Sequence, residues 1–164
     1  MKTLLLMRHG KSSWKDNDLS DHERPLKKRG RRDTKRIAQE IEKNDLYPHI
    51  ILSSSAARAK ETAEILMDTL EFENQILFSD QLYMAEPEDF IDVLSQLDDD
   101  NETVLVIGHN PGMEAFIQII DGEIESLPTA GLGQLILVLD SWQDISLDTM
   151  GDLVGLWKPR DLRD

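Results

Sequence analysis

The sequence predicts an α/β protein, a three-layer sandwich in which helices flank a mostly parallel central sheet. Short apolar runs of strand length alternate along the chain with amphipathic segments of helical period. Two of the runs, Thr3–Met7 and Thr103–Ile107, lead directly into turns that contain glycine and histidine. Continuous apolar runs of this kind are typical of central strands buried on both faces of a parallel sheet.

The first half of the chain is expected to hold two strands and two helices, with a loop directly after the first strand. Thr3–Met7 is the first strand, and the residues after Gly10 form a loop. A helix is expected from Pro25, because proline suits an early helical position and apolar residues then recur at steps of three or four. His49–Leu52 is the second strand, and the hydroxyls of Ser53–Ser55 suit the start of the following helix.

The middle of the chain continues the alternation. Ile76–Phe78 is expected to form a short strand, and a helix follows Pro87. Thr103–Ile107 is a further strand. Asn110 is a good N-cap and Pro111 a good first residue for the next helix.

The last part of the chain adds a strand at Gln134–Leu139, and the segment Ile145–Trp157 supplies one more. No low-complexity linker, internal repeat or break in composition divides the sequence. Residues 1–164 are therefore expected to form one domain.

The composition excludes several kinds of site. The 164 residues include no cysteine, so disulfides, thiolate nucleophiles and zinc sites with sulfur ligands are absent. The apolar stretch before Arg8 is too short for a signal peptide or a membrane span. We therefore expect a cytoplasmic protein that has no contact with a membrane.

The formal net charge of −14 argues against a nucleic-acid partner, since such proteins attract phosphate backbones with excess positive charge. The charge is nevertheless uneven, because the segment from Arg24 to Arg36 contains one acid, Asp33, and eight of the 18 basic residues. Two interpretations stay open for this segment: an ordinary solvated helix face, or a docking surface for an acidic protein. The basic residues are Arg24, Lys27, Lys28, Arg29, Arg31, Arg32, Lys35 and Arg36.

Two histidines are expected at one rim of the sheet. His9 and His109 each follow a confident strand, and ligands of open parallel sheets bind outside the carboxyl ends of the strands. Nothing near them has the spacing of a metal motif, so neither a metal nor another cofactor is expected. The planar fork of Arg8 matches phosphate, and a neutral imidazole can attack phosphorus directly. His22 and His49 lack a partner motif and are interpreted as structural or surface residues.

Four motifs occur in sequence order: Leu6–Gly10, Arg24-Pro25-Leu26 with Gly30, Ser53–Thr62 around Arg58, and Val106–His109. With these motifs the chain resembles the histidine phosphatase superfamily, and among its branches the short SixA-type phosphohistidine phosphatases. The resemblance spans nearly the full length. It implies a phosphoglycerate mutase-like sandwich and a phosphatase that needs no metal.

The resemblance also implies roles for individual residues. His9 is the nucleophile that becomes phosphohistidine, Arg8 and Arg58 grip the phosphoryl oxygens, and His109 completes the pocket as a donor. Two further residues are candidates for the pocket. Arg24 either leans over the pocket or is an ordinary member of the basic segment at the start of the helix. Ser12 is a candidate for a further hydrogen bond to phosphate.

The general acid is the point at which the sequence departs from the larger superfamily. Mutase and acid-phosphatase branches use a Glu or Asp to protonate the leaving oxygen, and here the corresponding stretch is Asp80–Pro87. Glu86 is its only attractive candidate. An acid just before Pro87 is, however, also what the dipole at a helix start favours.

The leading hypothesis is a phosphohistidine protein phosphatase whose partner is a phosphorylated protein, such as a histidine-phosphorylated signalling protein. One alternative is a phosphatase for small phosphomonoesters, which the presence of a general acid would favour. The other is a non-catalytic module that binds phosphate or phosphohistidine.

Overall fold

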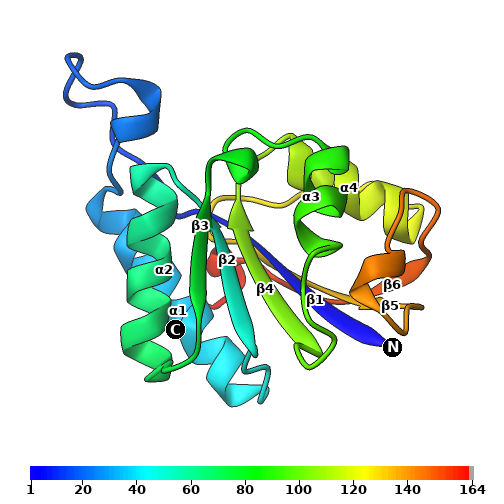
Figure 1. Cartoon of the computed structure of the whole chain (residues 1–164). Helices are drawn as coiled ribbons and strands as arrows, with labels where there is room; N and C mark the ends of the chain where they lie inside the picture. The colour runs from blue at the N-terminus through cyan, green and yellow to red at the C-terminus, as the bar shows by residue number, and fades with distance from the viewer. Residues whose placement is uncertain (163–164) are drawn as a thin grey trace.

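A six-stranded sheet forms the centre of the computed structural model, which describes residues 1–162 (Figure 1). The strands lie in the order β3-β2-β4-β1-β5-β6; the first four run parallel, and β5 and β6 are antiparallel to their neighbours. The predicted α/β class and mostly parallel sheet are therefore confirmed. The strands are β1 (Lys2–Arg8), β2 (Ile50–Ser54), β3 (Ile76–Ser79), β4 (Thr103–Gly108), β5 (Leu132–Leu137) and β6 (Gly151–Trp157).

Four helices cover the sheet on its two faces, as Figure 1 shows. Leu5 and Met7 of β1 pack towards α1 (Lys28–Lys43) and α2 (Ala57–Leu70). The alternate residues Leu4 and Leu6 belong to the opposite core, with α3 (Pro87–Leu94) and α4 (Gly112–Asp121). Because successive strand residues point to opposite faces, a continuous apolar run such as β1 supplies both cores at once.

Three helix starts differ from the sequence prediction. The first helix begins at Lys28 rather than Pro25, because residues 25–27 are extended and pair with the loop after β1 through a bridge between Ser12 and Leu26. Helix α2 begins at Ala57, since Ser53 and Ser54 still belong to β2. Helix α4 begins at Gly112 with Pro111 as its N-cap.

The remaining differences are small. The strand predicted at Gln134–Leu139 occurs two residues earlier, at Leu132–Leu137. The strand expected within Ile145–Trp157 is confirmed as β6. Among residues 1–162, none of the helices has the length and apolar character that crossing a membrane requires.

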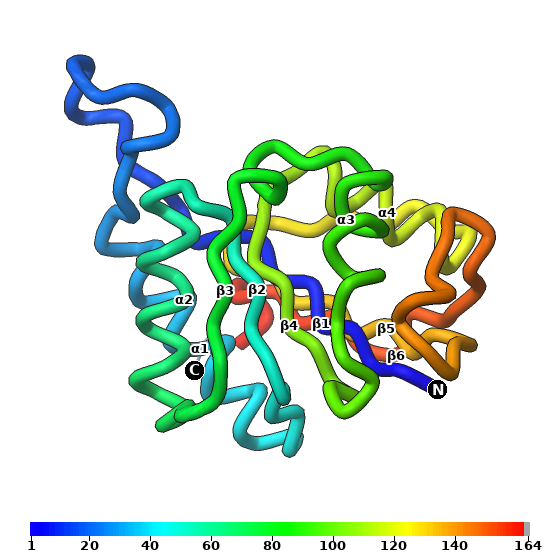
Figure 2. The backbone as a smooth tube through the Cα atoms, in the orientation of Figure 1, coloured from blue at the N-terminus to red at the C-terminus, as the bar shows by residue number. Residues whose placement is uncertain are grey.

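The segment between β1 and α1 projects beyond the helix layers at one end of the sheet (Figure 2). Its base approaches α1 very closely. A side chain at Gly10 would place its Cβ 2.7 Å from the carbonyl oxygen of Gly30, and a Cβ at Gly30 would clash with the backbone of Lys11. Glycine at both positions therefore lets the loop after β1 lie directly on the first turns of α1.

The register of the sheet determines which residues meet at its rim. Strands β1 and β4 are adjacent and parallel, and Arg8 pairs with Gly108 at their carboxyl ends. His9 and His109 directly follow these two strands, so both lie at the same edge of the sheet. Strand β2 lies on the other side of β4 and ends at Ser54.

Candidate active site

The two rim histidines face one cavity of about 400 Å³. Their ring centroids lie 5.0 Å apart, and the two residues are only 6% and 3% exposed. The expected pairing of His9 with His109 is thus present in the structure. All of the sequence-predicted pocket residues except Glu86 line the cavity: Arg8, His9, Ser12, Arg24, Arg58 and His109.

His9 is held in one tautomer by its two ring contacts. Its Nδ1 lies 2.7 Å from the carbonyl oxygen of Gly10, which can only accept, so Nδ1 carries the proton. Its Nε2 accepts from Nε of Arg58 at 3.3 Å. The backbone N–H of His9 also donates to the carbonyl of Gly108 at 3.1 Å. The Nε2 lone pair is therefore presented to the guanidinium side of the cavity.

The surroundings keep this ring neutral. Burial, together with the positive charges of Arg58, Arg8 and Arg24, lowers the pKa of His9 from 6.5 to about 4. A neutral imidazole keeps the lone pair that a nucleophile needs. His9 is accordingly available for attack throughout the neutral pH range.

Arg58, in the first turn of α2, connects the two histidines. Its Nη2 donates to Nδ1 of His109 at 3.4 Å, while its Nε donates to His9. The residue is 3% exposed. The hydroxyl of Thr62 donates to the Arg58 carbonyl at 2.8 Å and accepts from the N–H of Gly10 at 3.1 Å. Helix α2 and the loop after β1 are thus tied together where the guanidinium enters the cavity.

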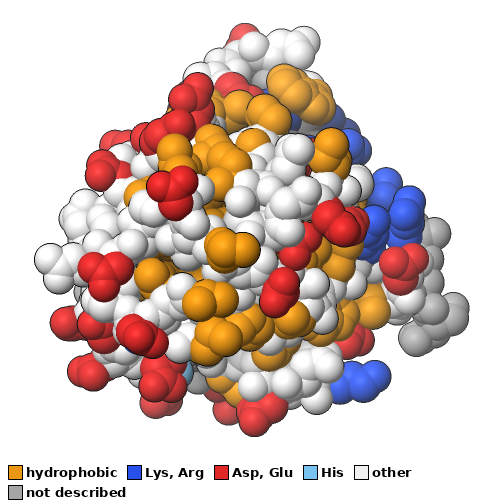
Figure 3. All heavy atoms as spheres, turned by 90° about the vertical axis from the view of Figure 1, so that its right-hand side faces the viewer, with side chains coloured by type: hydrophobic (Ala, Val, Ile, Leu, Met, Phe, Trp, Pro, Cys, Tyr) orange, Lys and Arg blue, Asp and Glu red, His pale blue; other side chains and the backbone are white. Residues whose placement is uncertain are grey.

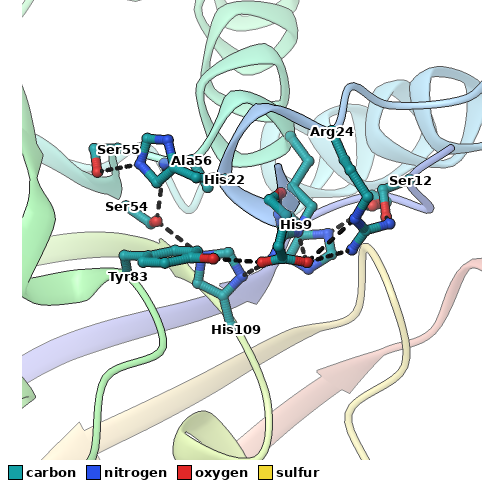
Figure 4. A network of polar contacts seen from close by, with 12 residues as sticks. His9, Ser12, His22, Arg24, Ser54, Ser55, Ala56, Tyr83 and His109 are labelled. Atoms are coloured by element: carbon teal, nitrogen blue, oxygen red, sulfur yellow. Dashed lines mark hydrogen bonds and ion pairs between the residues drawn. The ribbon is translucent and has the colours of Figure 1, made fainter. Parts of the chain in front are cut away.

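His109 differs from the donor expected from the sequence. Because an arginine can only donate, Nδ1 of His109 accepts from Arg58, and Nε2 donates to Ser54 Oγ at 2.8 Å. Figure 4 shows His109 next to Ser54 and Tyr83. Burial, together with neighbouring His9 and Arg58, lowers the pKa of His109 to about 3. The ring is neutral, and donation from Nδ1 to an anion in the cavity would require it to take up a proton or to change tautomer, with Nε2 then accepting from the Ser54 hydroxyl.

Arg8 supplies a free donor. Its Nη1 donates to the carbonyl of Leu127 at 3.2 Å, while its buried Nε has no hydrogen-bond partner among the described residues. A buried N–H without a partner costs free energy of roughly 1–3 kcal/mol. An oxyanion bound in the cavity can remove that cost.

Arg24 and Ser12 also belong to the cavity rather than to the solvated face of the basic helix. Nη1 of Arg24 donates to Ser12 Oγ at 2.7 Å, and both residues are buried. The exposed ring of Trp14 covers the Arg24 guanidinium, whose carbon lies 3.4 Å from the ring centroid. Figure 4 shows Arg24 and Ser12 beside His9.

Comparison with known proteins agrees with this geometry. The family model of branch 1 of the histidine phosphatase superfamily matches residues 4–82. An uncharacterised chloroplastic protein from Arabidopsis thaliana is 30% identical over 152 residues, which cover 87% of this chain and 70% of that protein. The chain belongs to the histidine phosphatase superfamily. It is a hydrolase of the phosphatase class.

Solved structures of this histidine phosphatase fold include SixA proteins. The Agrobacterium tumefaciens protein assigned as phosphohistidine phosphatase SixA has a TM-score of 0.83 at 25% identity, covering 96% of this chain and 98% of that one. A protein histidine phosphatase SixA complexed with tungstate has a TM-score of 0.84 at 22% identity, covering 98% and 99%. A mycobacterial glucosyl-3-phosphoglycerate phosphatase shares the fold at 14% identity, with a TM-score of 0.71 and coverage of 96% and 98%.

Sequence reasoning missed several residues that line the cavity, and two of them, Asp21 and Tyr83, contact the predicted ones directly. Asp21 accepts from Nη2 of Arg58 and Nε of Arg24, each at 3.1 Å, and from the hydroxyl of Tyr83. Its only sequence signal was its position three residues before Arg24. Tyr83 lies in the stretch examined for a general acid, but its ring stands edge-on to His109, with centroids 5.4 Å apart.

The two remaining histidines have different surroundings. His22 hydrogen-bonds through Nε2 to Ser55 Oγ at 2.9 Å and packs edge-on against Tyr83, so it supports the outer wall of the site (Figure 4). Nδ1 of His49 accepts from the backbone N–H of Thr103 at 3.1 Å. This contact lies where β2 and β4 begin, at the end of the sheet opposite the rim histidines. Neither residue lines the cavity.

Glu86 lies outside the cavity. It is the N-cap of α3, where its side chain and that of Asp89 form a capping box, and it lines a separate pocket beside Pro111. The residues described also contain no group of three or more His, Asp or Glu placed to hold a metal ion.

The low pKa values of the two rim histidines predict a measurable pH dependence. We expect the ring signals of His9 and His109 in an NMR titration to change at about 4 and about 3, rather than near 6.5. Unfolding restores the ordinary pKa, so these rings take up protons on unfolding below pH 6.5. The contribution of these rings to the free energy of unfolding should therefore be highest above pH 6.5, fall as the pH drops from 6.5 to about 4 for His9 and about 3 for His109, and level off below those values.

A control variant separates the causes of the shift. Arg58→Gln removes one positive charge, so the pKa of His9 should rise, yet stay below 6.5 because burial is the largest cause. Midpoints near 6.5 in the unmodified protein would contradict the neutral, buried histidine pair.

Proposed function

We propose that this histidine phosphatase removes the phosphoryl group from phosphohistidine in a protein substrate through a covalent intermediate on His9. The observation that carries the proposal is the fixed tautomer of His9, whose Nδ1–H is bound to Gly10 while Nε2 faces Arg58 and the cavity. The likeness to the SixA structures supports the phosphohistidine substrate. A cytoplasmic location stays a prediction from the sequence.

The first step transfers the phosphoryl group to the enzyme. The Nε2 lone pair of His9 forms a bond to phosphorus, and the bond from phosphorus to the substrate ring nitrogen breaks. Its electron pair stays on that nitrogen, so a substrate imidazolium leaves as neutral imidazole and keeps its other N–H. Arg8 and Arg58 hold the phosphoryl oxygens and offset their charge.

The second step releases phosphate. A water oxygen attacks phosphorus, the bond to Nε2 breaks, and its electron pair returns to His9 while the water gives up a proton to solvent. The bound phosphoryl dianion also raises the pKa of His109, because an adjacent negative charge favours the imidazolium. Once protonated at Nδ1, His109 becomes the donor that the sequence motif predicts.

Release of inorganic phosphate from a phosphohistidine peptide by the purified protein tests the proposal. Turnover supports a phosphatase, whereas stoichiometric binding without release would favour a non-catalytic phosphohistidine-binding module. The alternative function, hydrolysis of small phosphomonoesters, is suggested by the fold that the chain shares with glucosyl-3-phosphoglycerate phosphatase. A panel of phosphohistidine, phosphoaspartate, phosphoserine and sugar phosphates at equal concentration compares the two functions.

We expect full activity without divalent metal. Arg8, Arg58 and Arg24 place three positive charges around the cavity, which is the role that metals have in other phosphoryl-transfer sites. Exhaustive chelation should change the rate by less than about twofold. Loss of most activity, restored by one specific metal ion, would contradict this prediction.

The basic segment contains two overlapping groups of residues. Asp33 is buried and lies within 3.5–3.8 Å of the guanidinium groups of Arg29, Arg32 and Arg36, so one carboxylate offsets part of their charge. An open groove of about 650 Å³ is lined by Lys27, Lys28, Arg29 and Arg31, of which Arg31 also pairs with Glu61 at 3.4 Å. The groove shares Trp14 with the active-site cavity.

Charge on other parts of the molecule is mostly negative. Figure 3 shows the face around β5, β6 and α4, where acidic and apolar side chains predominate and the few basic ones lie at the edge. We propose that the basic groove docks an acidic surface of the phosphoprotein, because a protein with a charge of −14 otherwise repels such a partner.

Charge reversal tests the docking surface. Changing Lys27, Lys28 and Arg31 to glutamate should raise KM for a protein substrate about tenfold and weaken its salt dependence, while a small phosphoramidate is hydrolysed as before. Lys28→Glu and Lys43→Glu form a matched pair, because Lys43 lies at the opposite end of α1. An equal response of protein and small substrate would identify the groove as an ordinary solvated surface.

A further inference from the structure

An acidic side chain in the phosphate cavity requires an explanation. Asp21 is the single acid among the residues that line it, whereas Arg8, Lys11, Arg24 and Arg58 are positive. A carboxylate repels a phosphoryl dianion, so a role in phosphate binding would be limited to positioning Arg24 and Arg58. The exposed side of Asp21 offers a second role, contact with the other part of the substrate.

The carboxylate is firmly held. Oδ1 lies 3.1 Å from both Nε and Nη2 of Arg24, and Oδ2 accepts from Arg58 and Tyr83. The Arg58 Nη1 group also donates to the backbone carbonyl of Asp21 at 2.7 Å. Hydrogen bonding from Tyr83 and the charge of Arg58 lower the pKa of Asp21 to about 2. The group is therefore an anion throughout the neutral pH range.

Asp21 lies on the outer side of the cavity. Its side chain is 44% exposed, whereas His9 on the cavity floor is 6% exposed. Arg58 connects the two, since its Nε reaches His9 and its Nη2 reaches Asp21. In an in-line transfer the leaving group departs opposite the nucleophile, and that direction runs from His9 towards the mouth.

We propose that Asp21 is a specificity-determining residue, whose Oδ2 releases the Tyr83 hydroxyl and accepts a hydrogen bond from the ring N–H of a cationic imidazole leaving group. The inference rests on the proposed phosphohistidine function and names the group that recognises the departing histidine. Tyr83 and Trp14 line the same mouth with flat rings, which suit a planar imidazole. Figure 4 shows Tyr83 and Arg24 on either side of His9.

The balance of charge explains the selectivity. A phosphohistidine substrate carries a positive ring beside its negative phosphoryl group, so Asp21 attracts the ring while the arginines attract the phosphoryl oxygens. No proton moves to or from Asp21. The electron pair of the breaking P–N bond neutralises the ring, which leaves as imidazole. A serine ester has no such cation, so Asp21 only repels its phosphoryl dianion.

Asp21→Asn tests this assignment with two substrates. For a phosphohistidine peptide, kcat/KM should fall about tenfold, the effect of losing one hydrogen bond to a charged group. For p-nitrophenyl phosphate, whose leaving group needs no cationic partner, kcat/KM should stay the same or rise a few-fold as the repulsion is removed. Asp18→Asn, an equal charge change at an exposed position of the same segment, should alter neither value.

A fall in kcat/KM for the phosphohistidine peptide, with an unchanged or higher value for p-nitrophenyl phosphate, supports the assignment. Equal falls for both would show that Asp21 only positions Arg58, and equal rises would show that it merely occupies the phosphate site; either result overturns the inference. Its failure is separable from that of the proposed function. If unmodified protein does not hydrolyse the phosphohistidine peptide at all, the proposed function itself is wrong.

Discussion

Replacing His9 with alanine is expected to reduce turnover by about 10,000-fold or more, the scale seen when a covalent nucleophile is removed. His9 lines the cavity as a neutral ring whose Nδ1–H is held by the Gly10 carbonyl, which leaves the Nε2 lone pair directed at the Arg58 guanidinium. The substitution also removes the acceptor of the phosphoryl group. A phosphoenzyme that is labile to acid and stable to alkali should therefore form in the unmodified protein and be absent from the variant.

The controls distinguish chemistry from folding. His9→Asn keeps a polar side chain of similar width and should be as inactive as the alanine variant, with little change in Tm. His49→Ala removes an exposed histidine elsewhere on the sheet and should retain activity. Turnover of His9→Ala at the unmodified rate would eliminate the covalent mechanism.

Much of the site was predictable because it depends on strand ends. A buried strand can be recognised from its apolar run, and the residues that follow parallel strands meet at one edge. This reasoning placed His9 and His109 together, and the register of β1 with β4 confirms it. Arg58 was expected at the start of the helix after β2, and its place in the pocket came from the resemblance of Ser53–Thr62 to the superfamily motif.

The missed residues depend on a loop whose path no periodicity records. Asp21 reaches the cavity because the segment between β1 and α1 turns back over it, and the bridge between Ser12 and Leu26 fixes that return. The same bridge keeps residues 25–27 extended and delays the start of α1. A tertiary contact thus changed a helix boundary and brought an acid into the site, and neither effect has a local sequence pattern.

The second large effect is expected in the rate of hydrolysis, which should differ strongly between phosphohistidine and phosphoserine because their leaving groups differ. Serine departs as a strongly basic alkoxide unless an acid protonates it, and such an acid contributes roughly 100- to 10,000-fold in rate. Neither candidate carboxylate is suitable: Asp21, with a pKa of about 2, holds no proton, and Glu86 lies outside as the cap of α3. We therefore expect phosphoserine to be hydrolysed at least about 100-fold more slowly.

Glu86→Gln is the decisive variant, because it keeps an acceptor at the cap and removes only the capacity to donate an acidic proton. Phosphohistidine turnover should stay within about twofold, since its protonated imidazole leaves without help from an enzyme acid. Phosphoserine turnover should be low in both proteins. If the unmodified protein instead hydrolyses both substrates equally fast, and Glu86→Gln removes only phosphoserine activity, then Glu86 reaches the site during turnover. The enzyme would in that case be a phosphomonoesterase with a general acid, because only a proton donor can make the serine oxygen as good a leaving group as imidazole.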